Sequence, residues 1–82
     1  MATPPLDATD RAVLAVLMRH GVTVQDRTLG RVAAAAGLDA PAARRALQGL
    51  SARQPPLVRS DIDAGLDVEF WIATYDAAEA VE

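Results

Sequence analysis

The chain has no cysteine and no lysine among its 82 residues, and it has only three aromatic side chains. The absence of cysteine excludes disulfides, zinc–thiolate sites and thiol nucleophiles together. Phe70, Trp71 and Tyr75 lie within six positions of one another, so the remaining apolar content is aliphatic and rich in alanine. We therefore expect a thin core of closely packed small side chains and no deep enzyme cleft.

Long hydrophobic runs are also lacking. No apolar stretch approaches the roughly 18–20 residues of a membrane span. The segment Met1-Ala2-Thr3-Pro4-Pro5 has no basic region ahead of an apolar block, as a signal peptide would have. We expect a cytoplasmic protein without a membrane partner, forming one domain over residues 1–82 with residues 1–5 as an extended lead-in.

The charges are distributed unevenly. Residues 1–26 carry two Arg and three Asp, a net charge of −1. Residues 27–53 carry five Arg and one Asp, a net charge of +4, whereas residues 54–82 carry one Arg and seven acidic residues, a net charge of −6. An anionic partner would therefore be attracted to the middle of the chain and repelled by its end.

Capping residues and helical periodicity predict three helices. The first begins after Asp7, with Asp10 three residues on, and ends at Arg19-His20-Gly21. Thr28 and Gly37 bound a second helix over residues 29–36. Asp39 caps a third helix with Pro41 in its first turn, and its inward face consists of Ala43, Ala46, Leu47 and Leu50.

Strand signals surround the second and third helices. Val22-Thr23-Val24 is a short β-branched run that predicts a strand. From Leu57 the period changes to two, which predicts a hairpin over residues 57–73 with its turn at Ala64-Gly65-Leu66. Alternation places Phe70 and Ile72 inward, and Thr74 then caps a final helical turn from Tyr75 to Val81.

The stretch from Thr28 to Val58 resembles the winged helix-turn-helix of bacterial MarR-like and related small regulators. The residues that carry the resemblance are Val32-Ala33, Gly37-Leu38, Asp39, Ala43, Arg45, Ala46, Leu47, Leu50 and Leu57-Val58, with Leu6, Asp7 and Val13-Leu14 ahead of them. The resemblance implies an α+β fold, namely a three-helix winged helix-turn-helix with a C-terminal β-hairpin wing. Residues 28–53 would be the helix-turn-helix and residues 57–73 the wing.

The resemblance implies a transcriptional regulator that binds double-stranded DNA with its third helix in the major groove. Helical geometry turns Arg44, Arg45 and Gln48 outward, and arginine and glutamine pair with guanine and adenine edges respectively. Arg27 and Arg31 flank the start of the second helix, where they would contact phosphates. Solvated surface arginines with no ligand explain these positions equally well.

Two features depart from the regulators. Only eight residues follow Thr74, so we do not expect a dimer through a long flanking helix. The wing is acidic, with Asp61, Asp63, Asp67 and Glu69, which opposes phosphate binding. These departures motivate an alternative, a winged-helix protein-interaction module without DNA binding.

In that alternative the acidic wing, Trp71 and Tyr75 contact a protein partner or a second copy. Alternation turns Trp71 outward, and exposed aromatic residues at a charged rim often mark a protein interface. The other interpretation of Trp71 is that it covers the thin edge of the core.

No catalytic residue, cofactor or metal site is expected. The acidic residues of the wing do not match a calcium-binding loop, because Gly65 stands where the third carboxylate belongs and Glu69 comes too early. His20 follows the first helix, where capping carbonyl groups is its plain role. No serine and aspartate accompany it in a recognisable catalytic arrangement.

Overall fold

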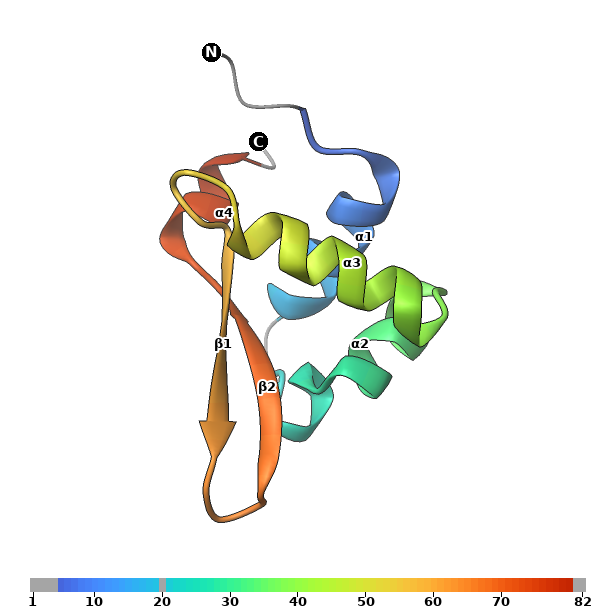
Figure 1. Ribbon diagram of the computed structural model, residues 1–82, viewed down its shortest axis with the longest axis vertical. Helices are drawn as coiled ribbons and strands as arrows, with labels where there is room; N and C mark the ends of the chain where they lie inside the picture. The colour runs from blue at the N-terminus through green and yellow to red at the C-terminus, as the bar shows by residue number, and fades with distance from the viewer. Residues whose placement is uncertain (1–4, 20, 81–82) are drawn as a thin grey trace.

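The computed structural model describes residues 5–19 and 21–80. Residues 1–4 of the expected lead-in, His20 and Val81 lie outside the described residues, so the expectations for them are not addressed by the structure. The described chain is α+β, with four α-helices, one short 3₁₀ helix and a two-stranded antiparallel hairpin that follows the third helix (Figure 1). Among these residues no helix has both the length and the apolar character that crossing a bilayer requires.

Helix α1, Ala8–Leu17, begins as the sequence predicts. The Asp7 carboxylate accepts a hydrogen bond from the Asp10 N–H at 2.8 Å, and the Asp10 carboxylate accepts one from the Asp7 N–H at 3.3 Å. This reciprocal capping box satisfies two N–H groups that the first turn leaves without helical partners. The predicted end is wrong, because the helix stops at Leu17 and its last turn contains no cation. Arg19 and Gly21 belong to the turn that follows it.

The segment predicted as a strand, residues 22–24, is not one. The Asp26 carboxylate accepts hydrogen bonds from the N–H and the hydroxyl of Thr23 at 3.2 and 3.0 Å, and the Asp26 N–H donates to the Thr23 hydroxyl. Side-chain bonds of this kind close a local turn in place of a strand ladder. The 3₁₀ helix η1, Gln25–Arg27, follows and packs against the hairpin.

Helices α2, Leu29–Ala36, and α3, Ala40–Ser51, have the predicted starts, and α2 has the predicted end. Gly37 ends α2 in the left-handed region at φ 73°, and the Asp39 carboxylate accepts from the Ala42 N–H at 2.8 Å. Thr28 precedes α2 but its side chain makes no capping bond, since its hydroxyl donates to the Gln25 carbonyl. Helices α1, α2 and α3 pack against one another.

Strand β1, Val58–Asp63, pairs with strand β2, Val68–Ala73, and residues 64–67 connect them. The register sets Val58 opposite Ala73 and Ser60 opposite Trp71. Residues directly opposite in a sheet share a face, so Trp71 shares its face with Val58, which is fully buried. The predicted orientation of β2 is therefore wrong: Trp71 is buried, while Phe70 and Ile72 are half-buried on the other face.

The buried side chains form one cluster among the helices and the base of the hairpin. Its members are Val13, Leu14, Val16, Leu17, Val32, Ala46, Leu47, Leu50, Leu57, Val58, Trp71 and Ala77. Two backbone bonds attach the hairpin to α3 and to the following segment, from the Leu57 N–H to the Leu50 carbonyl and from the Thr74 N–H to the Leu57 carbonyl. Helix α4, Tyr75–Ala80, adds Ala77 to the core.

Candidate nucleic-acid interface

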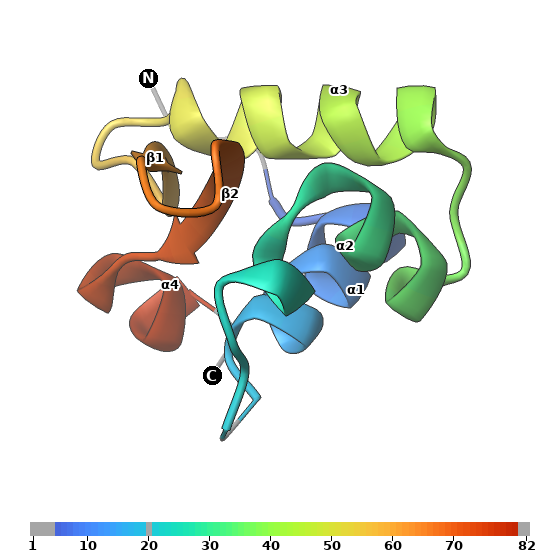
Figure 2. The same ribbon diagram turned by 90° about the horizontal axis from the view of Figure 1, so that it is seen from below.

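The outer face of α3 is the principal candidate surface. Ala43, Ala46, Leu47 and Leu50 are buried, as predicted from the spacing, and the opposite side of the helix is exposed. Figure 2 shows α3 as an outer layer with α1 and α2 on its inner side. Arg44, Arg45 and Gln48 all lie exposed on this helix, so the structure brings these three predicted residues together.

The two arginines of α3 have different surroundings. Arg44 and Gln48 are four residues apart and therefore neighbours along one side of the helix. Arg45 lies on the other flank, where it lines a hollow between α3 and the start of α1 together with Asp7 and Asp10. The negative charge of those carboxylates makes the electrostatic potential around Arg45 less positive, and the ion pair of Asp10 is with Arg53 at 3.8 Å. Arg44 and Gln48 do not line this hollow with its two carboxylates.

Arg27 and Arg31 come together around a different group, the carboxylate of Asp26. The N–H and hydroxyl of Thr23 lower the pKa of Asp26, and the charges of Arg31 and Arg27 lower it further. Arg31 also lines a hollow of about 500 Å³ with Val16, Arg19 and Asp26, and no residue of α3 lines it. The Nε of Arg27 is buried without a hydrogen-bond partner. The five predicted residues thus form two groups, three on α3 and two around Asp26.

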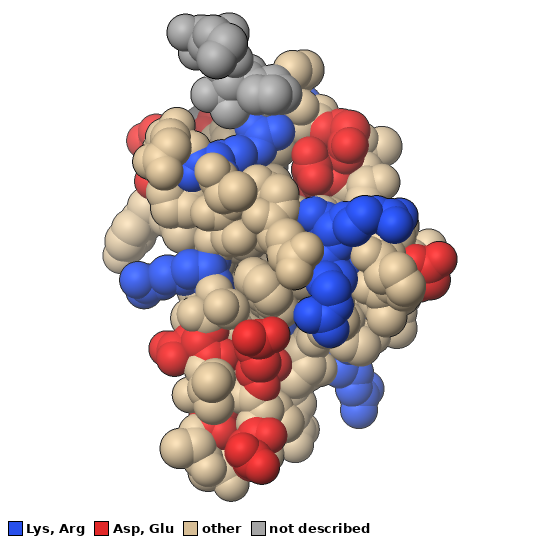
Figure 3. All heavy atoms as spheres, viewed as in Figure 1, with Lys and Arg blue, Asp and Glu red and all other residues tan. Residues whose placement is uncertain are grey.

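The hairpin places negative charge beside the candidate surface. Asp61, Asp67 and Glu69 are exposed and Asp63 is half-buried. In Figure 3, basic side chains lie over the middle of the face that carries α3, and acidic side chains gather over the hairpin below them. Two of these carboxylates have local partners: Asp63 accepts from the Leu66 N–H at 3.0 Å, and Asp61 accepts from the Ile62 N–H at 2.8 Å. Within residues 5–19 and 21–80 no group of three or more acidic or histidine side chains is arranged to hold a metal ion.

The aromatic residues of the alternative interface differ from each other in the structure. Trp71 belongs to the core, whereas Tyr75 is almost fully exposed at the start of α4. Two exposed apolar residues of the hairpin, Ile62 and Leu66, were not singled out from the sequence, and their side chains are 67% and 47% exposed. Alternation puts Ile62 on the face of the buried Val58, so the sequence pattern alone does not indicate that Ile62 is exposed. How far the helices extend along that face depends on packing.

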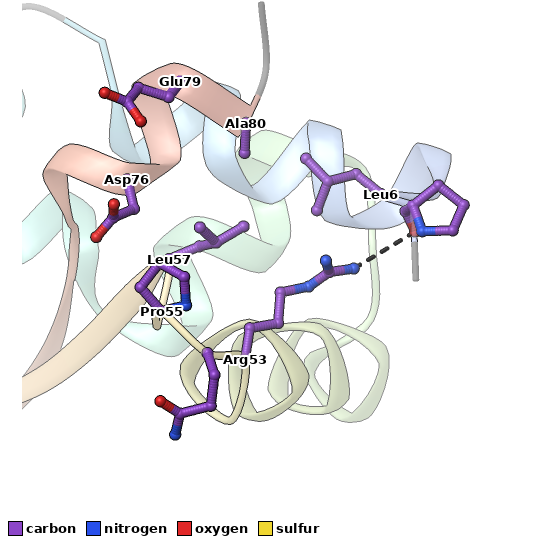
Figure 4. A pocket seen from close by; sticks show the side chains of 9 residues that line it. Leu6, Arg53, Pro55, Leu57, Asp76, Glu79 and Ala80 are labelled. Carbon is purple, nitrogen blue, oxygen red and sulfur yellow. Dashed lines mark hydrogen bonds between the residues drawn. The ribbon is translucent and has the colours of Figure 1, made fainter. Parts of the chain in front are cut away.

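A further hollow lies at the opposite end of α3 from its capped start. It has a volume of about 360 Å³ and is lined by the apolar side chains of Leu6, Pro55 and Leu57 and by charged groups from α4 (Figure 4). Arg53 reaches across it, donating to the Pro5 carbonyl at 3.4 Å and lying 3.8 Å from the Asp10 carboxylate. This arginine ties the segment ahead of α1 to the end of α3, and none of the five predicted DNA-binding residues lines the hollow.

Comparison of the chain with protein-family models, curated proteins and solved structures gives no significant match.

Proposed function

We propose that the chain binds duplex DNA by placing the exposed face of α3 in the major groove. The observation that carries the proposal is the exposure of Arg44, Arg45 and Gln48 on the outer side of a helix whose inner side packs in the core. An α-helix fits the major groove of B-DNA, and arginine and glutamine make bidentate contacts with guanine and adenine. We interpret α2, the Gly37 turn and α3 as the helix-turn-helix of a winged-helix regulator, with β1 and β2 as its wing.

The electrostatics favour a contact confined to α3. A wing that contacts phosphates normally does so with basic residues, and this hairpin carries four carboxylates. Phosphates would be repelled by the hairpin over about one Debye length, roughly 8–10 Å. The protein would therefore make fewer phosphate contacts than a winged helix with a basic wing, and its affinity would fall less steeply with salt.

The test is a fluorescence anisotropy titration of a mixed-sequence duplex between about 20 and 200 mM salt. We compare the double variant Arg44→Ala/Arg45→Ala with Arg11→Ala/Arg19→Ala, which removes the same charge from exposed positions outside α3. We expect the α3 variant to lose at least about tenfold in affinity at the lowest salt, since phosphate contacts supply binding to mixed-sequence DNA and this variant removes two cations from the helix in the groove. The matched control should change affinity by a much smaller factor.

Equal losses in the two double variants would show that only net charge matters and would reject the assignment to α3. No binding by the unmodified protein at the lowest salt would reject DNA as the ligand. That second result would favour the protein-interaction alternative, for which the exposed Tyr75 and the acidic hairpin are the supporting observations.

A further inference from the structure

Strand β1 has an open outer edge. Within the described chain the sheet contains only β1 and β2, so β1 is hydrogen-bonded on one side. In Figure 1 no other helix or strand runs alongside its outer side. Arg59, Ser60, Asp61 and Ile62 are all exposed, whereas Val58 at the start of the strand is fully buried. An open edge presents unpaired backbone groups to another strand.

The register determines which backbone groups face outward. The Thr74 N–H donates to the Leu57 carbonyl, which makes Val58 and Ala73 a pair without direct hydrogen bonds. Antiparallel strands alternate between bonded and non-bonded pairs. Arg59 and Asp61 therefore bond to β2, and Ser60 and Ile62 direct their N–H and C=O groups to the outer edge. The bond from the Ile62 N–H to the Asp61 carboxylate agrees with this assignment.

The order of charges along the edge is self-complementary in one register. If two β1 strands pair antiparallel through their outward groups, the two-fold axis passes through one residue of each copy. An axis at Arg59 sets Arg59 against Arg59, and an axis at Asp61 sets Asp61 against Asp61. An axis at Ile62 sets Asp61 against Asp63. Only an axis at Ser60 sets opposite charges together, with Arg59 of each copy facing Asp61 of the other.

We propose that two copies of the chain associate through β1, antiparallel, about an axis at Ser60. The N–H and C=O groups of Ser60 bond to those of Ser60 in the second copy, and two Arg59–Asp61 ion pairs flank them. A two-fold contact of this kind uses the same surface on both partners and closes on itself. We assign a second copy as the partner of this edge because Arg59 and Asp61 of one β1 strand face Asp61 and Arg59 of another in this register.

The neighbouring residues are compatible with this short ladder. The Asp61 carboxylate accepts from the Ile62 N–H with Oδ1, which leaves Oδ2 to face Arg59 of the second copy. Val58 is covered, so the ladder is confined to residues 59–61. In the same register Ile62, which is 67% exposed, comes to lie beside the start of the partner strand and loses part of its exposed area. None of these residues belongs to α3, so the association does not depend on DNA binding.

The experiment uses charge reversal at the two facing positions. Sedimentation velocity and NMR diffusion at concentrations up to about 1 mM suit an interface of this size. Arg59→Asp or Asp61→Arg alone sets like charges against each other in the pair and should weaken association at least about tenfold. The double swap Arg59→Asp/Asp61→Arg, and an equimolar mixture of the two single variants, restore opposite charges and should recover it.

Two further variants test the geometry. Ser60→Pro removes the outward N–H without removing a bond to β2, and it should abolish association while circular dichroism still shows a folded hairpin domain. Arg45→Asp and Glu69→Arg are the charge-matched controls away from the edge. Neither control should weaken association as the single β1 variants do, and mixing the two controls should not strengthen it. The proposal is overturned if the unmodified chain stays monomeric at about 1 mM, or if mixing the single β1 variants fails to restore association.

Discussion

Trp71 and Tyr75 are only four positions apart along the chain, yet Trp71 is 7% exposed and Tyr75 is 98% exposed. The chain changes direction between them, where β2 ends at Ala73 and the Thr74 hydroxyl donates to the Pro56 carbonyl at 2.7 Å. In α4 the buried residue is Ala77, two positions after Tyr75. Two helical positions correspond to about 200° of rotation, so Tyr75 points away from the core.

The two aromatic side chains should contribute very differently to stability. We expect Trp71→Ala to lower the free energy of unfolding by about 3–5 kcal/mol, because it opens a large cavity in a core of small residues. Tyr75→Ala should change the free energy of unfolding by less than about 0.5 kcal/mol. Urea denaturation followed by far-ultraviolet circular dichroism measures both values. If Trp71→Ala does not fold, Trp71→Phe supplies a smaller loss in the same direction. Similar effects at the two positions would contradict the structure.

Two glycines of the α2 region form a second contrast. Gly37 adopts φ 73°, which an alanine enters only at a cost of about 1 kcal/mol. Gly30 lies within α2, and a Cβ there would meet no atom within 4 Å. Gly37→Ala should lower the melting temperature, whereas Gly30→Ala should raise it, because alanine is favoured over glycine inside a helix by about 1 kcal/mol. A rise for both variants in differential scanning calorimetry would show that Gly37 does not need its left-handed conformation.

The contrast between helices and hairpin shows what the sequence could predict. The starts of α1 and α3 depend on Asp7 and Asp39 bonding to residues three positions away, so local sequence contains the whole signal. The outward positions of Arg44, Arg45 and Gln48 follow from helical periodicity once the helix is placed. The face of Trp71 depends on which residue of β1 it meets, and that register involves partners eleven positions away along the chain. The presence of Asp7 and Asp10 beside Arg45 likewise depends on how α1 packs against α3.

The turn formed by Thr23 and Asp26, where the sequence predicts a strand, makes a pH-dependent contribution to the free energy of unfolding. The pKa of Asp26 is lowered from its ordinary value of 3.8, first by the Thr23 N–H and then by the Thr23 hydroxyl. A carboxyl group whose pKa is lower in the folded state stabilises the fold above its ordinary value, and this contribution is lost as the pH falls through the lowered value. Thr23→Val removes the hydroxyl and keeps the N–H, so the pKa of Asp26 should move part of the way back toward 3.8.

Carbon-13 NMR of the Asp26 carboxyl group measures that shift directly. The variant should also lose less stability than the unmodified protein on acidification below pH 3.8, because less of its stability depends on the ionised carboxylate. If the pKa of Asp26 is unchanged in Thr23→Val, the Thr23 hydroxyl does not contribute to lowering it.

The acidic hairpin should weaken DNA binding through its charge. We expect Asp67→Asn/Glu69→Gln to raise affinity for a duplex by roughly twofold to fourfold at about 20 mM salt, with the difference shrinking toward 200 mM. Asp67 has a positive φ of 54°, a conformation that asparagine also tolerates, so the fold should be retained. Anisotropy titrations of both proteins measure the ratio. A ratio that stays constant with salt would show that the hairpin acts through something other than electrostatic repulsion.

The position of Trp71 also gives the molecule an optical reporter. The chain has one tryptophan, and its indole lies in the core with Nε1 buried and without a hydrogen-bond partner. Such an indole emits at shorter wavelength than one in water, so loss of the fold should appear as a red shift from a single emitting group. Because Trp71 is on the hairpin and belongs to the same buried cluster as residues of α1, α2, α3 and α4, its spectrum reports whether strand and helices remain assembled. Because Trp71 does not lie on α3, its emission reports unfolding separately from the anisotropy signal that reports DNA binding.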